Sequence, residues 1–264
     1  MSTPQTWHYG LVAKWWAEFN VDGPEIDYFR GFIEDSGQPA LDVACGTGRL
    51  LLPYLRAGLD VDACDVSRDM VELCRRRAET EGLAPTLFVQ PMHELEPPRR
   101  YRTIIVCGGI GLGSTRAQDQ EAFRRLYDAL EPGGLLAFDN EVPYANARLW
   151  QMWPNEEHQR LPEAMREGGE RRRASDGSDL ELLTRVVGLD RLDQRLRLEL
   201  VAREWRDDTI VSEETHALDM RVYFKHELVL MLECAGFRDV EVRAGYTGAE
   251  PSGDEDFLVF VARR

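Results

Sequence analysis

Hydrophobic positions in the first half of the chain gather into short runs, which are separated by longer segments with one apolar face. The short runs predict buried strands at residues 40–43, 61–64, 86–89, 102–107 and 135–138. The segments between them predict helices at residues 48–57, 69–81 and 117–130. In the last helix, one apolar stripe is formed by Ala122, Phe123, Leu126, Tyr127 and Leu130. Short apolar strands alternating with amphipathic helices are typical of a parallel sheet covered on both faces.

The pattern changes after about Ala145, where the chain becomes more polar and more charged. Three segments alternate hydrophobic and polar residues with a period of two, at residues 180–189, 196–205 and 209–218. Turn-like residues separate them, which predicts a small antiparallel β-meander inserted into the main fold. A helix at 225–235 and strands at 240–243 and 257–261 follow. We therefore predict an α/β fold, in which a Rossmann-like sheet of seven strands carries an inserted antiparallel β-meander.

The length of 264 residues fits one domain with a sizeable insertion, and 43% hydrophobic residues are enough for a packed core. No apolar stretch approaches the roughly 20 residues of a membrane span, so we expect no membrane partner. The first ten residues lack a basic segment followed by an apolar one, so no secretory signal is expected. The five cysteines form no CxxC pair, which favours free thiols in a reducing cytoplasm.

The excess of acidic residues restricts the kinds of partner that we expect. The net charge is −15, from 47 acidic and 32 basic residues, whereas a nucleic-acid binder gathers basic charge on one face. We interpret the basic triplets Arg75–Arg77 and Arg171–Arg173 as solvated faces and expect no nucleic-acid partner. An acidic surface attracts cations weakly, which suits an amine substrate. The excess of arginine over the two lysines, Lys14 and Lys225, is typical of a GC-rich bacterial genome.

The stretch from Leu41 to Arg49 reads LDVACGTGR and joins the first predicted strand to the first predicted helix. Gly46 and Gly48 allow the backbone to turn sharply and to approach a ligand closely. The helix behind them presents free N–H groups and the positive end of its dipole, where a nucleoside-linked anionic group docks. Asp65 ends the second strand, at the position of an acid that hydrogen-bonds ribose hydroxyls.

The glycine spacing narrows the choice of nucleoside. A dinucleotide site needs a third small residue in G-x-G-x-x-G/A, and this position falls on Leu51. Leucine there would block close packing of the helix, so a nicotinamide dinucleotide is disfavoured. The chain also lacks the GK[ST] sequence of a P-loop.

The stretch DVACGTG at residues 42–48 resembles motif I of class I S-adenosylmethionine-dependent methyltransferases. Four further stretches resemble motifs of that class in the right order: VDACDVS at 61–67, LEPGGLL at 130–136, ECAGF at 233–237 and the final strand at 257–264. The resemblance covers roughly residues 25–144 and 223–264, and it implies that the last strand runs antiparallel. Within the class, the overall plan resembles natural-product N-methyltransferases of deoxyaminosugar and lincosamide pathways, and more distantly glycine N-methyltransferases.

The resemblance implies roles for individual residues. The loop after the first strand would contact the methionine part of the cofactor through Asp42, Ala44, Cys45, Gly46, Thr47, Gly48 and Arg49. Asp65 would hold the ribose, Val66 and Met70 would flank the adenine, and Cys107 and Gly108 would pass close to the sulfonium. The acid that usually ends the third strand is absent, because residues 90–93 read QPMH. We therefore expect backbone groups near Met92 and His93 to recognise the adenine.

Methyl transfer from a sulfonium is an in-line displacement, so the protein needs to align a nucleophile and exclude water, and no metal is expected. Glu141 follows the fifth strand, where it would accept a hydrogen bond from a substrate ammonium or act as a base. His93 lies near the expected edge of the cofactor. Tyr9 lies in an aromatic N-terminal segment that would close over the methionine end. These three residues are the catalytic candidates.

We expect an N-terminal lid at residues 1–22, a cofactor-binding domain at residues 23–144 and 223–264, and a meander at residues 145–222. The meander would be a substrate lid or the surface of a homodimer. The leading hypothesis is a small-molecule N-methyltransferase that converts S-adenosyl-L-methionine to S-adenosyl-L-homocysteine. The alternatives are an O-methyltransferase of the same fold and a cofactor-binding protein without catalysis.

Overall fold

A computed structural model describes residues 6–154 and 156–264 of the chain. Its main sheet has seven strands in the order β10-β11-β5-β4-β1-β2-β3. The strands are β1 (Ala40–Val43), β2 (Val61–Asp65), β3 (Leu87–Val89), β4 (Tyr101–Val106), β5 (Leu130–Glu141), β10 (Arg238–Ala244) and β11 (Phe257–Arg263). Strands β1 to β5 are parallel, and β11 is antiparallel to both of its neighbours. The predicted Rossmann-like sheet with a reversed last strand is therefore confirmed.

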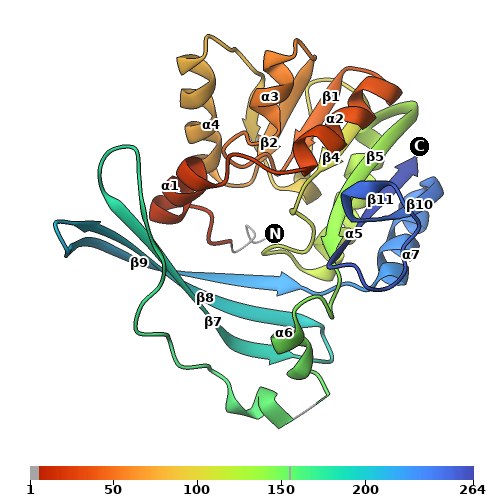
Figure 1. Ribbon diagram of the computed structural model, residues 1–264. Coiled ribbons are helices and arrows are strands. Elements are labelled where there is room, and N and C mark those ends of the chain that lie inside the picture. Colours follow the sequence, from red (N-terminus) through yellow and green to blue (C-terminus); the bar gives the residue numbers. More distant parts are fainter. Residues whose placement is uncertain (1–5, 155) are drawn as a thin grey trace.

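Helices cover both faces of this sheet (Figure 1). The α-helices are α1 (Gly10–Phe19), α2 (Glu25–Ser36), α3 (Leu51–Arg56), α4 (Arg68–Thr80), α5 (Arg116–Ala129), α6 (Ala147–Gln151) and α7 (Lys225–Ala235), and the 3₁₀ helices are η1 (Met92–Glu94), η2 (Glu156–Arg160) and η3 (Gly245–Thr247). Successive side chains of a strand point to opposite faces, so Ile104 of β4 joins the core beneath α5 and α7, whereas Ile105 joins the core beneath α2, α3 and α4. The continuously apolar strands thus supply two cores at once.

Two predicted boundaries differ from the structure. The helix predicted at 48–57 begins only at Leu51, because Gly46 and Gly48 have φ values of 54° and 87° and hold the preceding segment in a turn. The strand predicted at 135–138 extends over Leu130–Glu141, since its second half pairs along its length with β11. Helices α1 and α2 were not predicted as elements.

The predicted meander is a second, four-stranded antiparallel sheet in the order β6-β7-β8-β9. It contains β7 (Asp179–Asp190), β8 (Arg195–Arg206), β9 (Thr209–Arg221) and an additional edge strand, β6 (Arg171–Arg173). Arg172 of β6 is half-buried, and its guanidinium lies 4.2 Å from the centroid of the Phe19 ring. The interpretation of this arginine triplet as a wholly solvated face is therefore wrong at Arg172.

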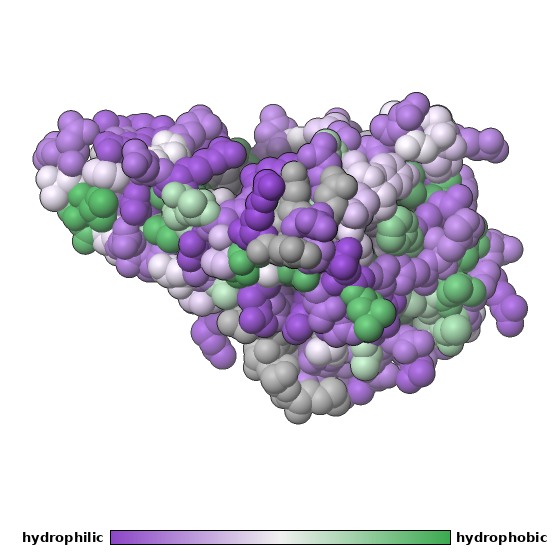
Figure 2. Space-filling view, turned by 90° about the horizontal axis from the view of Figure 1, so that it is seen from below, coloured by the Kyte–Doolittle hydropathy of each residue, from purple (hydrophilic) through white to green (hydrophobic). Residues whose placement is uncertain are grey.

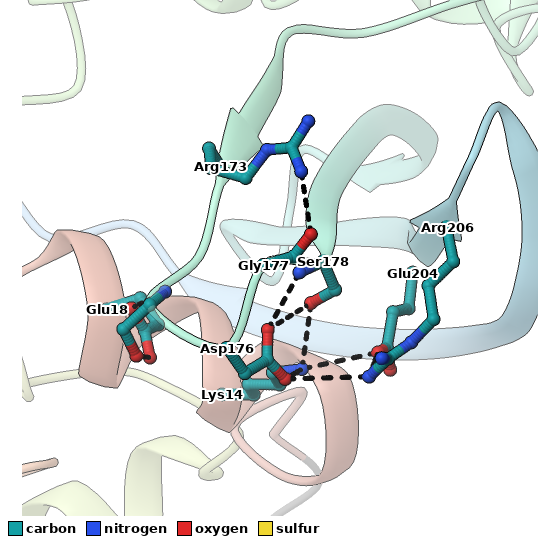
Figure 3. Close-up of polar contacts among 9 residues, drawn as sticks. Lys14, Glu18, Arg173, Asp176, Gly177, Ser178, Glu204 and Arg206 are labelled. Carbon is teal, nitrogen blue, oxygen red and sulfur yellow. Dashed lines mark hydrogen bonds and ion pairs between the residues drawn. The ribbon is translucent and has the colours of Figure 1, made fainter.

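Helix α1 lies between α4 and the meander (Figure 1) and is bonded to both. The Gly10 backbone N–H donates to Asp69 of α4 at 2.8 Å. On the other side, the Lys14 ammonium contacts Asp176 at 2.8 Å and Glu204 at 3.4 Å, as Figure 3 shows. Glu18 accepts a hydrogen bond from the Ser175 backbone N–H at 2.9 Å. We call these contacts of Lys14 and Glu18 the clasp, because they join α1 to the meander.

The inner face of the meander is apolar at both of its ends. Leu180 and Leu200 pack against α1, while Val186 and Leu196 pack against the region of α6. Seen from below, the molecule presents a mostly hydrophilic surface with hydrophobic side chains in separate spots (Figure 2). Within the residues that the structure describes, every helix is too short or too polar to cross a membrane.

Candidate active site

A cavity of about 340 Å³ lies at the carboxyl ends of β1 to β4, and we call it the first cavity. It is the edge at which open α/β sheets bind ligands. The predicted cofactor residues that line it are Asp42, Ala44, Cys45, Gly46, Thr47, Arg49, Asp65, Val66, Met70, Met92, His93, Cys107 and Gly108. Its roof includes Leu198, Leu218 and Met220 of the meander. Segments far apart in the sequence thus enclose one space.

Gly48 is the one predicted cofactor residue that does not line the first cavity. A Cβ atom at this position would lie 2.7 Å from the Cys74 sulfur and 3.1 Å from the Leu52 side chain. Gly48 therefore allows the loop and α3 to pack against α4. Gly46 differs, because no atom lies within 4 Å of the position that its Cβ would occupy. Both glycines form the predicted turn, with φ values of 54° and 87°, but only Gly46 has open space beside it for a ligand.

Asp65 is held by the backbone of the glycine-rich loop. Its Oδ2 accepts the Gly46 N–H at 2.9 Å, and its Oδ1 accepts the Ser67 N–H at 2.8 Å. Burial raises the pKa of Asp65, and these N–H groups oppose the shift by stabilising the charged form. A carboxylate oxygen accepts more than one hydrogen bond, so Asp65 retains capacity toward the cavity.

Asp42 is a second buried carboxyl group in the same wall, only 2% exposed. Its Oδ2 has no hydrogen-bond partner among the described residues. Burial, followed by the nearby charge of Asp65, raises the pKa of Asp42 to about 8. A buried acceptor without a partner is costly, so the arrangement suits a ligand that brings a positive charge or a donor to this point.

Arg49 and Cys107 meet on another wall of the first cavity. The Arg49 guanidinium forms an ion pair with Glu25 of α2 and donates to the Cys107 sulfur at 3.5 Å. Burial, and then the charge of Asp139, raises the pKa of Cys107 well above its ordinary value. Cys107 is therefore a thiol at neutral pH, so a reactive thiolate is not available there.

The N-terminal segment closes part of the first cavity with Trp7 and His8. The Trp7 indole donates to His8 Nε2 at 3.2 Å, and burial lowers the pKa of His8 to about 4, so its ring is neutral. Tyr9, the residue predicted at this place, is 46% exposed and does not line the cavity. Its ring packs against His216 at a centroid distance of 4.4 Å. The structure thus brings His8, rather than Tyr9, to the cavity.

His93 is 3% exposed, so it is a core residue rather than a surface one. Its Nε2 lies 3.0 Å from the Gln118 amide nitrogen, and Asp119 lines the cavity beside it. Sequence reasoning missed Gln118 and Asp119 because they occupy the first turn of an ordinary amphipathic helix. The available signal was two adjacent polar residues that lie three and four positions after a capping threonine, Thr115.

A second cavity, of about 720 Å³, lies at the ends of β5 and β10. It shares Gly108, Leu112 and Met220 with the first cavity, so the two spaces adjoin. Glu141, predicted as a catalytic residue, lines the second cavity.

Three carboxylates line the second cavity: Asp139, Glu141 and Asp256. Partial burial, and then the charge of Asp256, raises the pKa of Glu141. Asp139 Oδ2 accepts the Tyr246 hydroxyl at 2.5 Å, and its Oδ1 accepts the Gly108 N–H at 2.5 Å. Asp139 thus links the walls of both cavities. Tyr246 was missed because its position, after the sixth strand of the sheet in chain order, carries no local motif.

Two arginines also line the second cavity, and each is bonded to a residue outside it. Arg148 forms an ion pair with Glu163, and Arg221 donates to the Asp193 backbone carbonyl at 3.0 Å. The cavity is therefore suited to a cationic group. Over residues 6–154 and 156–264, no cluster of three histidine, cysteine or acidic side chains is arranged to hold a metal ion.

The sequence is similar to proteins that are described as methyltransferases. Residues 40–134 match the model of a family described as a methyltransferase domain. The putative methyltransferase YqeM of Bacillus subtilis (strain 168) is 24% identical over 229 residues, which cover 85% of this chain and 83% of that protein. A putative methyltransferase of Geobacillus sp. (strain WCH70) is 26% identical over 152 residues, covering 54% of this chain and 61% of the relative.

A third relative is a ubiquinone biosynthesis O-methyltransferase of Xanthomonas euvesicatoria pv. vesicatoria (strain 85-10), 28% identical over 152 residues. This match covers 52% of the chain and 61% of the relative. The chain thus spans less than two thirds of the length of this protein and of the Geobacillus one.

Solved structures share the fold over almost the whole chain. The sugar N-methyltransferase KedS8 from Streptoalloteichus sp ATCC 53650 has a TM-score of 0.70 and 18% identity, covering 100% of this chain and 99% of that one. An S-adenosylmethionine-dependent methyltransferase from Clostridium acetobutylicum ATCC 824 has a TM-score of 0.69 and 15% identity, covering 91% and 90%. CalS10, an amino pentose methyltransferase from Micromonospora echinaspora with bound S-adenosylmethionine, has a TM-score of 0.59 and 19% identity, covering 91% and 88%. At these identities, the likeness establishes the fold alone.

The first cavity fits the cofactor of this class. S-adenosylmethionine brings an ammonium group and ribose hydroxyls, which need acceptors. The unpartnered oxygen of Asp42 and the loop-bound carboxylate of Asp65 supply buried acceptors, while Gly46 leaves space beside them. Residues 40–134 thus match a methyltransferase domain, and the chain around them has the fold of S-adenosylmethionine-dependent methyltransferases.

Proposed function

We propose that this protein transfers a methyl group to an amine nitrogen of a small molecule bound in the second cavity. One observation carries the proposal: a cavity lined by three carboxylates adjoins the cofactor cavity through Gly108, Leu112 and Met220. An amine acceptor arrives at neutral pH as an ammonium ion, for which carboxylates are the natural partners. The chain would place that nitrogen beside the wall that the two cavities share.

The cofactor, when bound, supplies a methyl group already activated by a positive sulfur. The protein then has to orient the amine, remove its extra proton and keep water away. Glu141 accepts this proton, because its raised pKa brings it closer to that of the substrate. Asp139, fixed by Tyr246 and the Gly108 N–H, orients the acceptor. Leu112 and Met220 exclude water from the shared wall.

Among the similar proteins, some are named as N-methyltransferases and others as O-methyltransferases. KedS8 is described as a sugar N-methyltransferase, and the Xanthomonas relative as an O-methyltransferase. A hydroxyl acceptor needs a stronger base than an amine does, and histidine is the usual choice. Among the described residues, none that lines the second cavity is a histidine. This composition favours the amine over the hydroxyl.

The same proposal assigns parts of the chain. In this proposal, residues 1–22 and 145–222 would cover a cofactor-binding domain at residues 23–144 and 223–264, as the described residues Trp7, His8 and Met220 that line the first cavity support. A second cavity beside the first supports catalysis over simple cofactor binding. The acidic charge supports a small molecule over nucleic acid as the partner. Five free cysteines support a reducing, cytoplasmic setting.

Matched pairs of small molecules test the proposal. Each pair carries an amine or a hydroxyl at the same position of the same skeleton, and mass spectrometry detects a gain of one methyl group. We expect the amine members to be methylated, and Glu141→Gln to slow their methylation while S-adenosylhomocysteine still binds. Methylation of the hydroxyl members alone would reject an amine acceptor in favour of O-methylation. No methylation of either, with the cofactor bound, would show that the acceptor class is wrong.

A further inference from the structure

The adenine end of the first cavity lacks the acid that usually follows the third strand in the methyltransferases that this chain resembles. Met92 and His93 line the cavity at that place instead of a carboxylate. Adenine presents an exocyclic amine, which donates hydrogen bonds, and ring nitrogens, which accept them. The Met92 thioether is a weak acceptor, so it cannot satisfy a buried amine donor. Gln90 also lines this cavity, but its Oε1 already accepts the Glu96 N–H at 3.0 Å. A charged acceptor for the adenine amine, beyond the backbone groups near Met92 and His93, therefore has to come from another element.

Helix α5 brings such an acceptor to the same cavity. Its first turn packs beside η1, where the Gln118 amide nitrogen lies 3.0 Å from His93 Nε2. The next residue, Asp119, is 4% exposed and also lines the first cavity. The segments that contain His93 and Asp119 are separated by strand β4, so only the fold places them together.

The Asp119 carboxylate is bonded but not saturated. Its Oδ1 accepts the Ser114 hydroxyl at 2.5 Å, and its Oδ2 accepts the Tyr223 hydroxyl at 2.5 Å. An ionised carboxylate offers about four acceptor directions, so two donors leave capacity for a third.

A buried carboxylate is costly unless it is well partnered. Among the described residues, no basic side chain forms an ion pair with Asp119, which makes two hydroxyl donors a sparse set. A ligand donor at the cavity wall would complete this set.

We propose that Asp119 recognises the adenine base by accepting a hydrogen bond from its exocyclic amine, with Gln118 and His93 framing the same edge. This inference rests on the assignment of the first cavity to S-adenosylmethionine. In it, α5 supplies the carboxylate that is missing after β3, and Tyr223 and Ser114 hold that carboxylate in place. Asp119 would thus set the specificity for adenine and take no part in methyl transfer.

Calorimetry with two nucleosides tests the proposal on the full chain. S-adenosylhomocysteine carries the amine, whereas S-inosylhomocysteine carries an oxygen at the same ring position. We expect the wild-type protein to bind the adenine compound about 10- to 100-fold more tightly, since the inosine oxygen would face the carboxylate. In Asp119→Asn, whose amide can donate to that oxygen, we expect this preference to fall to a few-fold or to reverse.

Tyr223→Phe is the matched control, because it removes one donor to Asp119 but keeps the carboxylate. We expect it to lower the thermal stability and to retain the preference for adenine. Equal weakening of both nucleosides in Asp119→Asn would overturn the proposal and leave Asp119 a structural residue. Equal affinities of the wild-type protein would overturn it too, whether or not the variant folds. Binding of neither nucleoside to the wild-type protein would instead reject the cofactor assignment itself.

Discussion

The two cavities adjoin but are built in different ways. The first cavity is lined by carboxyl groups that are almost completely buried, Asp42 at 2% and Asp65 at 8% exposed, and backbone N–H groups hold the second of them. The second cavity is lined by Glu141, which is only partly buried, and by loop residues around α6, with Arg148 paired to a neighbouring acid. The first therefore has a fixed shape set by strand ends, whereas the second depends on side chains that can be exchanged.

Because the two cavities differ in this way, we expect substitutions in them to affect different steps of the reaction. Changes in the first cavity should alter cofactor binding, because a buried group that loses its partner is costly. Changes in the second should alter turnover of the acceptor and leave the cofactor bound. The roof belongs to both cavities, since Met220 of the meander lines each of them. The following predictions test this separation, from the largest effect to the smallest.

Asp65→Ala should weaken S-adenosylhomocysteine binding by at least about 100-fold, because it removes the ribose acceptor and leaves the Gly46 and Ser67 N–H groups unpaired. Calorimetry measures the affinity. Asp62→Asn is the control: Asp62 is a buried carboxylate of the same strand, bonded to Arg99 outside the cavity. We expect it to lower stability only. Equal losses of affinity in both variants would mean that the effect is not local.

Glu141→Gln should lower the rate of methyl transfer to an amine by about 10- to 100-fold, because the proton acceptor is lost. Affinity for S-adenosylhomocysteine should stay within about twofold, since Glu141 does not line the first cavity. Steady-state kinetics with a mass-spectrometric assay, together with calorimetry, measures both. An unchanged rate would remove Glu141 from the mechanism.

Asp256→Asn is the companion variant for pH. The charge of Asp256 contributes to the raised pKa of Glu141, so its removal should lower that pKa. Glu141 must be ionised to accept a proton, so the acidic limb of kcat/KM should move to lower pH. A shift to higher pH would contradict this assignment of roles.

Asp42→Asn should change both the stability and the cofactor affinity, the latter by about tenfold, and both changes should depend on pH. The folded-state pKa of about 8 lies above the ordinary value of 3.8, so the folded protein binds a proton that the unfolded chain releases. Stability without cofactor should therefore fall as the pH rises from about 4 to about 8, and Asp42→Asn should remove this fall. Thermal unfolding at several pH values measures it, and parallel curves for wild type and variant would contradict it.

The affinity of the cofactor should follow the opposite trend. Ionised Asp42 attracts the cofactor ammonium, so binding to the wild-type protein should tighten between pH 6 and 7.5. In Asp42→Asn, the affinity should be flat over this range and about tenfold weaker at its upper end. Calorimetry in buffers of different ionisation enthalpy would detect the proton released on binding.

Lys14→Met should have the smallest effect, because it breaks partly exposed ion pairs of the clasp, which contribute at most about 1 kcal/mol. We expect the dissociation rate of S-adenosylhomocysteine to rise about two- to fivefold, since α1 would open more often. Arg197→Met is the control, because Arg197 pairs with Asp219 within the meander, away from the clasp. A similar rise in both variants would show that the clasp does not govern access.

Local patterns were enough to identify the first cavity. The strand, the glycine-rich turn and Asp65 lie within about 25 residues, and their hydrogen bonds join residues no more than 19 positions apart. Gly48 was predicted as a ligand contact, but it does not line the first cavity. It does need to be glycine, but the reason is Cys74 on another helix, which no local pattern reveals.

The resemblance to class I methyltransferases implied the reversal of the last strand. The sequence by itself determined the alternation of strands and helices between residues 40 and 141 and the glycine-rich turn before α3. The reason is that periodicity and glycine turns act over a few residues. Only the tertiary structure decided which side chains share a wall: Asp139 with Tyr246, and His93 with Gln118 and Asp119. These contacts depend on how strands stack side by side in the sheet and on how the meander folds back over it. Such distances are set by packing of the whole core, and the sequence encodes them only through that packing.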